Sequence, residues 1–127
     1  MAKHSKPTTI KALIREDQPC LAICVGKKCA KAGAKHILAA AGAGLEAEAL
    51  GEIPLRLTKC QDFCDDAPML SVLPGEFPYL KLTPAGVRQI VSAHLGRGEP
   101  VRDLLHKRAR RRLEKQERRL AEAAQED

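Results

Sequence analysis

Four of the five cysteines in the chain fall into two closely spaced pairs. Cys24 and Cys29 have four residues between them, and Cys60 and Cys64 have three. Two such pairs can supply four thiolates to a zinc ion or an iron–sulfur cluster, or they can act as redox dithiols. Neither pair has the two-residue spacing common in zinc knuckles, whereas a cluster of two irons and two sulfides suits wider loops. The spacing therefore favours iron–sulfur chemistry, with zinc and dithiols as alternatives.

The elements that must position these thiols are predicted from apolar patterning. A short apolar run predicts a buried strand over 20–25, and helical spacing predicts a helix over 30–41 that Gly42 and Gly44 interrupt. Alternating apolar residues then predict a second strand over 53–57. A strand, a crossover helix and a second strand favour a parallel pair. Cys24 and Cys60 lie at the carboxyl ends of the two strands, Cys29 lies just before the helix and Cys64 lies in the loop after the second strand. All four thiols should therefore meet at one edge of the sheet.

The rest of the repeating pattern completes an α/β fold. Apolar runs at 69–73 and 79–82 flank a Pro-Gly turn and predict a hairpin. Thr83 and Pro84 are a favourable N-cap and first helical residue, and the helix that follows them should end at Gly96. The order β-α-β-β-β-α predicts a thioredoxin-like sandwich, followed by a basic C-terminal helix.

Three stretches of the sequence resemble a known family. They read C-V-G-K-K-C-A-K-A-G, then T-K-C-Q-D-F-C-D-D-A-P-M, then P-Y-L-K-L-T-P-A-G-V-R-Q-I-V. Over about residues 20–100 the chain resembles the thioredoxin-like 2Fe–2S ferredoxins. It is equally similar to the homologous 2Fe–2S subunit of NADH:quinone dehydrogenases and some hydrogenases. The resemblance implies a 2Fe–2S cluster whose ligands are Cys24, Cys29, Cys60 and Cys64.

The implied function is one-electron transfer to or from a partner redox protein, without catalysis by this chain. The alternatives are an electron-transfer subunit of a dehydrogenase or hydrogenase complex and, in another class, a zinc-stabilised interaction module. Only 19 residues precede Cys20, which favours the stand-alone carrier. One departure from the family is Gln61-Asp62, where relatives often have Leu-Gly.

Other residues that could do chemistry have simpler interpretations. Cys20 shares strand parity with Cys24 and is expected to be a small core residue. His36 and His94 lie on or beside helical faces and are expected to be surface or packing residues. Pro68 precedes the third predicted strand, where thioredoxin-like folds place a cis-proline, so a cis bond is considered there.

The basic charge is concentrated near the C-terminus. The segment Lys107–Arg119 has eight basic residues against two acidic ones, a local charge of +6. We expect a solvated or self-associating helix, so that a homodimer is possible. Docking of an acidic redox partner by this helix and a basic loop is the alternative. Nucleic acid or an anionic membrane surface is least favoured, since base stacking needs aromatic residues and the segment has none. The loop lysines are Lys27, Lys28 and Lys31.

Length and composition bound the remaining possibilities. At 127 residues and 44% apolar content, the chain should form one domain over 20–100, with an N-terminal extension over 1–19 and a charged helix over 101–127. Removal of that helix is expected to leave the fold intact. No stretch has the ~20 apolar residues of a membrane span, and the N-terminus has no apolar leader segment. Cysteines in a chain without a leader predict a reducing compartment, the cytoplasm.

Overall fold

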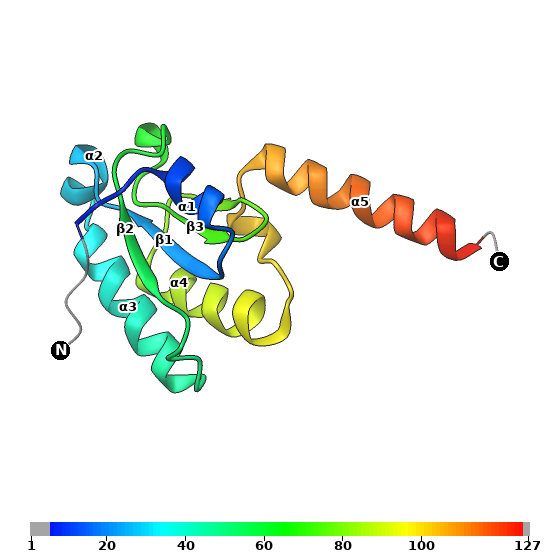
Figure 1. Cartoon of the computed structure of the whole chain (residues 1–127), viewed down its shortest axis with the longest axis horizontal. Helices are drawn as coiled ribbons and strands as arrows, with labels where there is room; N and C mark the ends of the chain where they lie inside the picture. Colours follow the sequence, from blue (N-terminus) through cyan, green and yellow to red (C-terminus); the bar gives the residue numbers. More distant parts are fainter. Residues whose placement is uncertain (1–5, 126–127) are drawn as a thin grey trace.

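Four short strands form the sheet at the centre of the molecule (Figure 1). The computed structural model describes residues 6–125. The sheet order is β2-β1-β3-β4, with β1 and β2 parallel and the other neighbouring pairs antiparallel. The predicted parallel pair and hairpin are therefore confirmed, and the Ala67–Pro68 bond is cis. The strands are β1 (Cys20–Cys24), β2 (Leu55–Thr58), β3 (Leu70–Leu73) and β4 (Phe77–Tyr79).

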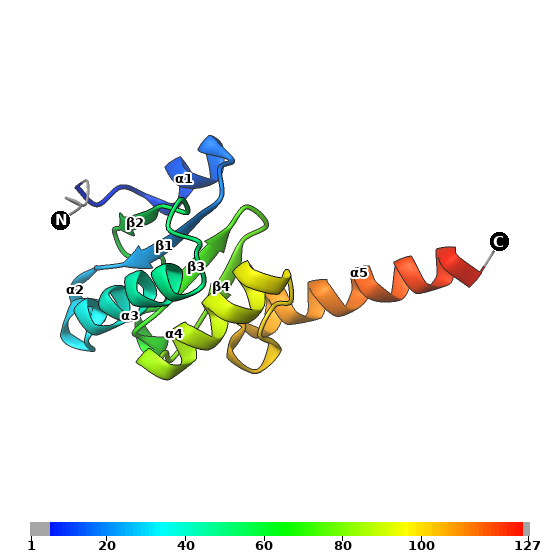
Figure 2. The same ribbon diagram turned by 90° about the horizontal axis from the view of Figure 1, so that it is seen from below.

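Helices α3 (Ala34–Ala47) and α4 (Pro84–Ile90) cover one face of the sheet (Figure 2). As predicted, Thr83 caps α4, because its side chain accepts a hydrogen bond from the Gly86 amide at 3.1 Å. The chain then continues as a single π turn, η2 (Val91–Leu95). The main core lies between these helices and the sheet, where apolar side chains of the helices pack against those of the strands. The core residues include Leu21, Ile23, Ile37, Leu45, Leu70, Val72, Val87 and Ile90.

Two glycines that were expected to interrupt a helix lie inside it. Helix α3 continues through Gly42 and Gly44 to Ala47. A Cβ on Gly44 would lie 3.4 Å from the Val91 side chain. Because glycine has no side chain, α3 and η2 can approach closely at this point. The interruption falls earlier, at Gly33, whose φ of 103° separates α3 from the short helix α2 (Lys27–Lys31).

Helix α1 (Ile10–Glu16) covers part of the opposite face of the sheet (Figure 2). Thr9 caps it, and Leu13 is buried against Cys20, Ala22 and Leu73. The expected extension over 1–19 thus contains a packed helix. Two helical turns are too short to show a clear period in the sequence, and tertiary packing stabilises them instead.

The C-terminal helix begins later than expected. Helix α5 spans Lys107–Gln125, after the one-turn helix η3 (Arg102–Leu104). The Leu80 amide donates to the Leu104 carbonyl at 3.0 Å, so this segment pairs with the chain at the end of β4. Val101, Leu105 and Ala109 are buried in the main core, so removal from residue 101 onward would expose that core, contrary to the expectation above.

Beyond its first turns, α5 projects away from the sheet and its covering helices (Figures 1 and 2). Leu113 is half-buried and every residue from Glu114 to Gln125 is exposed. The lengths and compositions of the helices in residues 6–125 do not allow any of them to cross a membrane.

Candidate metal centre

The parallel strands bring the cysteines to one edge of the sheet. Cys24 is the last residue of β1, and its register partner is Thr58, the last residue of β2. Cys60 follows Thr58 by two residues, and Cys64 begins the one-turn helix η1 (Cys64–Asp66). Figure 1 shows α2, which carries Cys29, at the same end of the molecule as the loop after β2. All four cysteines of the two pairs therefore lie on adjacent segments.

The first pair is part of the core. Cys24 and Cys29 are 2% and 3% exposed and pack with Ala34 and Met69. Cys29 lies within α2, not just before the first helix as expected, because Gly26 caps a helix that starts at Lys27. Burial, followed by the hydrogen bond with the Cys24 thiol, raises the pKa of Cys29 to about 12. A metal ion that binds this thiol must therefore displace its proton.

The second pair lies at the surface. Cys60 is exposed, Cys64 is partly exposed, and their Sγ atoms are 3.1 Å apart as free thiols. The hydrogen bond between the Cys60 and Cys64 thiols is the main cause that raises the pKa of Cys64. The Asp62 amide donates to the Cys60 Sγ atom at 3.3 Å, and the φ of 67° at Asp62 turns the backbone there. The loop thus supplies one N–H donor to a sulfur.

The loops that carry the two pairs are in contact with each other. The Cys24 thiol donates to the Lys59 carbonyl, with 3.7 Å between sulfur and oxygen. A Cβ on Gly26 would lie 3.1 Å from the Cys60 Cα, so the two loops touch backbone to backbone. Within residues 6–125, no three His, Cys, Asp or Glu side chains form a group that could hold a single metal ion.

Charged side chains surround the exposed pair. The Lys28 ammonium lies 3.6 Å from the Asp65 carboxylate, joining α2 to η1, and the Lys81 ammonium lies 3.8 Å from that of Asp66. Lys27 and Lys31 are exposed on α2. The two loops therefore carry charges of opposite sign, and one ion pair connects them.

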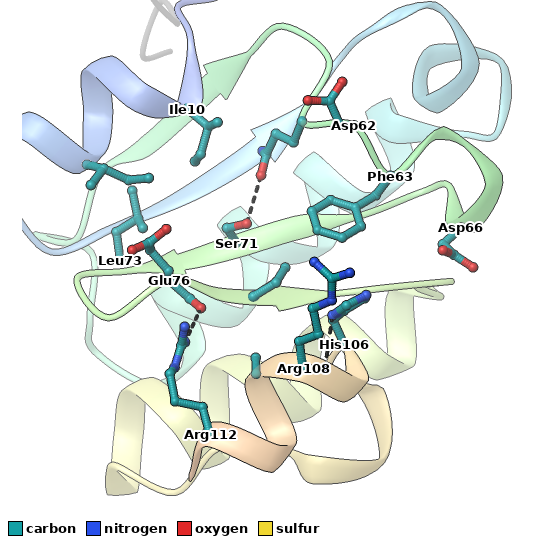
Figure 3. Close-up of a pocket in the computed structure, with 14 residues that line it drawn as sticks. Ile10, Asp62, Phe63, Asp66, Ser71, Leu73, Glu76, His106, Arg108 and Arg112 are labelled. Atoms are coloured by element: carbon teal, nitrogen blue, oxygen red, sulfur yellow. Dashed lines mark hydrogen bonds between the residues drawn. The ribbon is translucent and has the colours of Figure 1, made fainter. Parts of the chain in front are cut away.

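A groove lies beside the second pair, between α1 and the first turns of α5 (Figure 3). Its volume is about 600 Å³. The Phe63 ring, between the two cysteines of the loop, meets the His106 ring edge-on with centroids 5.2 Å apart. At its other end, the Arg112 guanidinium donates to the Gly75 and Glu76 carbonyls at 2.9 and 2.7 Å. The start of α5 is therefore attached to both the cysteine loop and the hairpin.

The sequence did not indicate the polar side chains behind the second pair. Gln61, Thr58 and Ser71 are buried and hydrogen-bonded to one another. The sequence shows Gln61-Asp62 as a departure from the family, but the inward position of the Gln61 amide depends on the sheet. A glutamine next to a cysteine has no local signal that distinguishes a buried network from a surface side chain.

The remaining thiol and imidazoles are away from the pairs. Cys20 is 4% exposed and packs on the α1 face, as predicted for a core residue. His36 is exposed, whereas the His94 Nδ1 atom and the Tyr79 hydroxyl are hydrogen-bonded at 2.7 Å, and that hydroxyl accepts a hydrogen bond from the Val101 amide. Burial lowers the pKa of His94 to about 4. His94 therefore has the predicted packing role.

Comparison with solved structures finds similarity to a thioredoxin-like [2Fe-2S] ferredoxin from Aquifex aeolicus. Its wild-type crystal structure shares 25% sequence identity with this chain at a TM-score of 0.63, and the match covers 70% of this chain and 96% of that one. A cysteine-to-serine variant of it shares 23% at a TM-score of 0.59, covering 69% and 97%. No protein-family model and no curated protein matches the chain. The likeness confirms the thioredoxin-like fold and the resemblance inferred from the motifs.

Proposed function

We propose that this chain is a one-electron carrier that holds a 2Fe–2S cluster on Cys24, Cys29, Cys60 and Cys64. The observation that carries this proposal is the meeting of two thiol pairs at one edge of a fold shared with a [2Fe-2S] ferredoxin. When bound, such a cluster supplies a centre that accepts and donates one electron. A carrier, not an enzyme, fits the similarity to a ferredoxin.

The pairing of the thiols favours a cluster over a single zinc ion. A structural zinc ion takes four thiolates around one centre. Here Cys60 and Cys64 form one close pair, and Cys24 and Cys29 form another. Two pairs suit two iron ions that are each held by two thiolates. Dithiol exchange is less favoured, because the first pair is buried and burial raises the pKa of Cys29 to about 12.

The residues around the thiols divide the work of an electron carrier. The buried first pair excludes water from the inner side of the site, and the exposed second pair gives a partner short access to it. The Asp62 amide donates to the Cys60 sulfur, and hydrogen bonds to ligand sulfurs raise the reduction potential. Free thiols in all five cysteines suit a reducing compartment, so the proposal places the protein in the cytoplasm.

The partner is proposed to be a redox protein with an acidic surface. The exposed cations of α5 lie on one side of the helix, opposite its apolar residues. The contact between His106 and Phe63 attaches the start of this helix to the loop of the second pair. A partner bound along α5 and the α2 lysines would therefore be held near the exposed thiols. The α5 cations are Lys107, Arg108, Arg111, Arg112, Lys115, Arg118 and Arg119.

Metal and sulfide analysis of anaerobically purified protein tests the cluster. We expect about two irons and two sulfides per chain, visible absorbance that falls on dithionite reduction, and a one-electron paramagnetic signal. One zinc per chain, with no visible absorbance after anaerobic reconstitution, would contradict the proposal.

The salt dependence of electron transfer tests the docking surface. The reduced protein is mixed with oxidised cytochrome c, which is basic, or with a flavodoxin, which is acidic, and the rate is followed by absorbance. The triple variant Arg111→Glu, Lys115→Glu, Arg118→Glu should slow reduction of the flavodoxin at low salt, and the difference should shrink at high salt. The matched control carries the same charge change at exposed Lys11, Lys35 and Arg88, away from α5. Equal slowing by both triple variants would contradict docking by α5.

A further inference from the structure

One hydrogen-bonded group contains all the buried polar side chains of residues 6–125, leaving aside tyrosine and cysteine. Thr58 is 0% exposed, Ser71 is 4% exposed and Gln61 is 6% exposed. Gln61 directly follows Cys60, and Thr58 lies two residues before Cys60. The buried polarity of this chain is therefore placed behind the exposed cysteine pair.

The Gln61 amide connects three neighbouring strands. Its Nε2 atom donates to the Ala22 carbonyl of β1 at 3.2 Å and to the Thr58 hydroxyl at the end of β2 at 2.8 Å. Its Oε1 atom accepts from the Ser71 hydroxyl of β3 at 2.7 Å, the bond drawn at Ser71 in Figure 3. No buried side-chain nitrogen or oxygen in residues 6–125 lacks a partner. The network is therefore complete.

A complete buried network allows few alternative arrangements. If Gln61 moved outward, the Ser71 and Thr58 hydroxyls would stay behind in the core and lose partners there, which is costly. The amide is thus fixed relative to β1, β2 and β3. Because Cys60 is the adjacent residue, its Cα is fixed as well, next to Gly26 of the first loop.

Cys60 needs this support more than the other three cysteines. Cys24 and Cys29 are held by the core, and Cys64 lies in η1. Cys60 is exposed and lies outside any helix or strand, and its thiol contacts only the Cys64 sulfur and the Asp62 amide through hydrogen bonds. Its side chain belongs to none of the apolar clusters of residues 6–125.

We propose that Gln61 is a positioning residue, which holds Cys60 where it completes the four-thiolate set. This inference rests on the proposed function. The amide acts through the backbone of Cys60 and does not itself contact a metal or a thiol. Its loss should loosen the second pair while the first pair keeps its place.

The test compares Gln61→Leu, Ser71→Ala and the double variant with the parent and with Gln89→Leu, the same change at an exposed glutamine of α4. Four quantities are measured: the rate of cluster loss to an iron chelator, the visible circular dichroism of the bound cluster, the alkylation rate of Cys60 by iodoacetamide in metal-free protein, and the free energy of unfolding. We expect Gln61→Leu to lose the cluster roughly tenfold faster, from the loss of its three buried hydrogen bonds. Its circular dichroism should change, Cys60 should be alkylated several-fold faster, and Gln89→Leu should match the parent.

The double variant separates positioning from general stability. Ser71 contacts the loop through Gln61 alone, so Gln61→Leu with Ser71→Ala should lose the cluster no faster than Gln61→Leu. Cluster loss and Cys60 alkylation equal to the parent in Gln61→Leu would overturn the proposal. The proposal would also be overturned if both rates rose in Gln61→Leu by no more than its loss of unfolding free energy explains. If the parent protein takes up no cluster, the proposed function is refuted instead. The alkylation rates of Cys60 in the metal-free parent and in Gln61→Leu then still decide whether Gln61 positions the loop.

Discussion

The two cysteine pairs lie at the same edge of the sheet but are held in place in different ways. Cys24 and Cys29 belong to β1 and α2, and apolar packing against Ala34 and Met69 fixes them. Cys60 and Cys64 belong to a surface loop, which is fixed by the Gln61 network and local contacts. The position of the first pair is therefore determined by the core, and the position of the second pair by a few hydrogen bonds. The second pair can thus be changed without unfolding the protein.

The same contrast divides the C-terminal region. Val101, Leu105 and Ala109 are buried in the main core, whereas Leu120 is 66% exposed on the projecting part of α5. Both parts belong to one continuous segment of sequence. Only the first part contributes to the stability of the sheet.

The largest expected effect comes from the cysteines themselves. Serine at Cys24, Cys29, Cys60 or Cys64 should abolish or severely destabilise the cluster, because each thiolate is one of four ligands, while Cys20→Ser should retain it. In metal-free protein the pairs should differ. Serine at buried Cys29 should cost about 1–3 kcal/mol, and serine at exposed Cys60 less than about 0.5 kcal/mol. Visible spectra and urea unfolding measure both effects, and equal costs at the two sites would contradict the comparison.

Truncation should separate the two parts of the C-terminal segment. A chain that ends at Pro100 loses three buried side chains and the amide that donates to Tyr79, so we expect a loss of about 3–5 kcal/mol or no stable fold. Every described residue that is lost from a chain ending at Leu113 is exposed, so this chain should unfold within about 0.5 kcal/mol of the parent. Thermal unfolding of the two truncated proteins checks this. If both were as stable as the parent, the packing of Val101 and Leu105 would be unimportant.

Gly26→Ala should push the two cysteine loops apart. The new Cβ would lie 3.1 Å from the Cys60 Cα and 3.2 Å from the Cys60 amide nitrogen, and backbone atoms cannot rotate away. We expect a loss of about 1–3 kcal/mol in unfolding free energy and faster release of the cluster. Gly51→Ala is the control, because nothing lies within 4 Å of the added Cβ. Unchanged cluster release in Gly26→Ala would show that the loops can separate without harm.

Acid should weaken the core contact between Tyr79 and His94. The pKa of His94 is lowered from 6.5 to about 4, so the unfolded chain binds a proton in this range before the folded chain does. Stability is therefore full above about pH 6.5 and falls as the pH drops towards about 4. The ring is only partly buried, so we expect a loss of roughly 1–2 kcal/mol. Urea unfolding of metal-free protein at several pH values measures it; His94→Gln should flatten the profile, and His36→Gln should not.

The smallest effect is expected at the ion pair between the loops. The Lys28 and Asp65 side chains are 63% and 97% exposed, so solvent screens their attraction. Lys28→Ala should change the unfolding free energy by less than about 0.5 kcal/mol and leave cluster retention unchanged. A marked loss of the cluster in Lys28→Ala would mean that charge, and not the Gln61 network, holds the second loop.

The sequence alone determined the framework of this protein. Apolar runs predicted β1, β2 and β3, and Thr83-Pro84 predicted the start of α4. The fourth strand was expected over 79–82 but forms earlier, at Phe77–Tyr79, where it pairs with β3. The strand–helix–strand order then implied the parallel pair and the meeting of both cysteine pairs. These features were predictable because they depend on local periodicity, capping and the handedness of a crossover.

The tertiary structure alone decided the features that depend on contacts between distant residues. Gly44 stays inside α3 because Val91 packs against it, and α1 forms because Leu13 finds an apolar surface on the sheet. The chain at Leu105 joins the core because the end of β4 offers a free edge. Gln61 turns inward because three strands present its partners together. Each of these side chains has an environment that no local stretch of sequence contains, because it exists only once the sheet has formed.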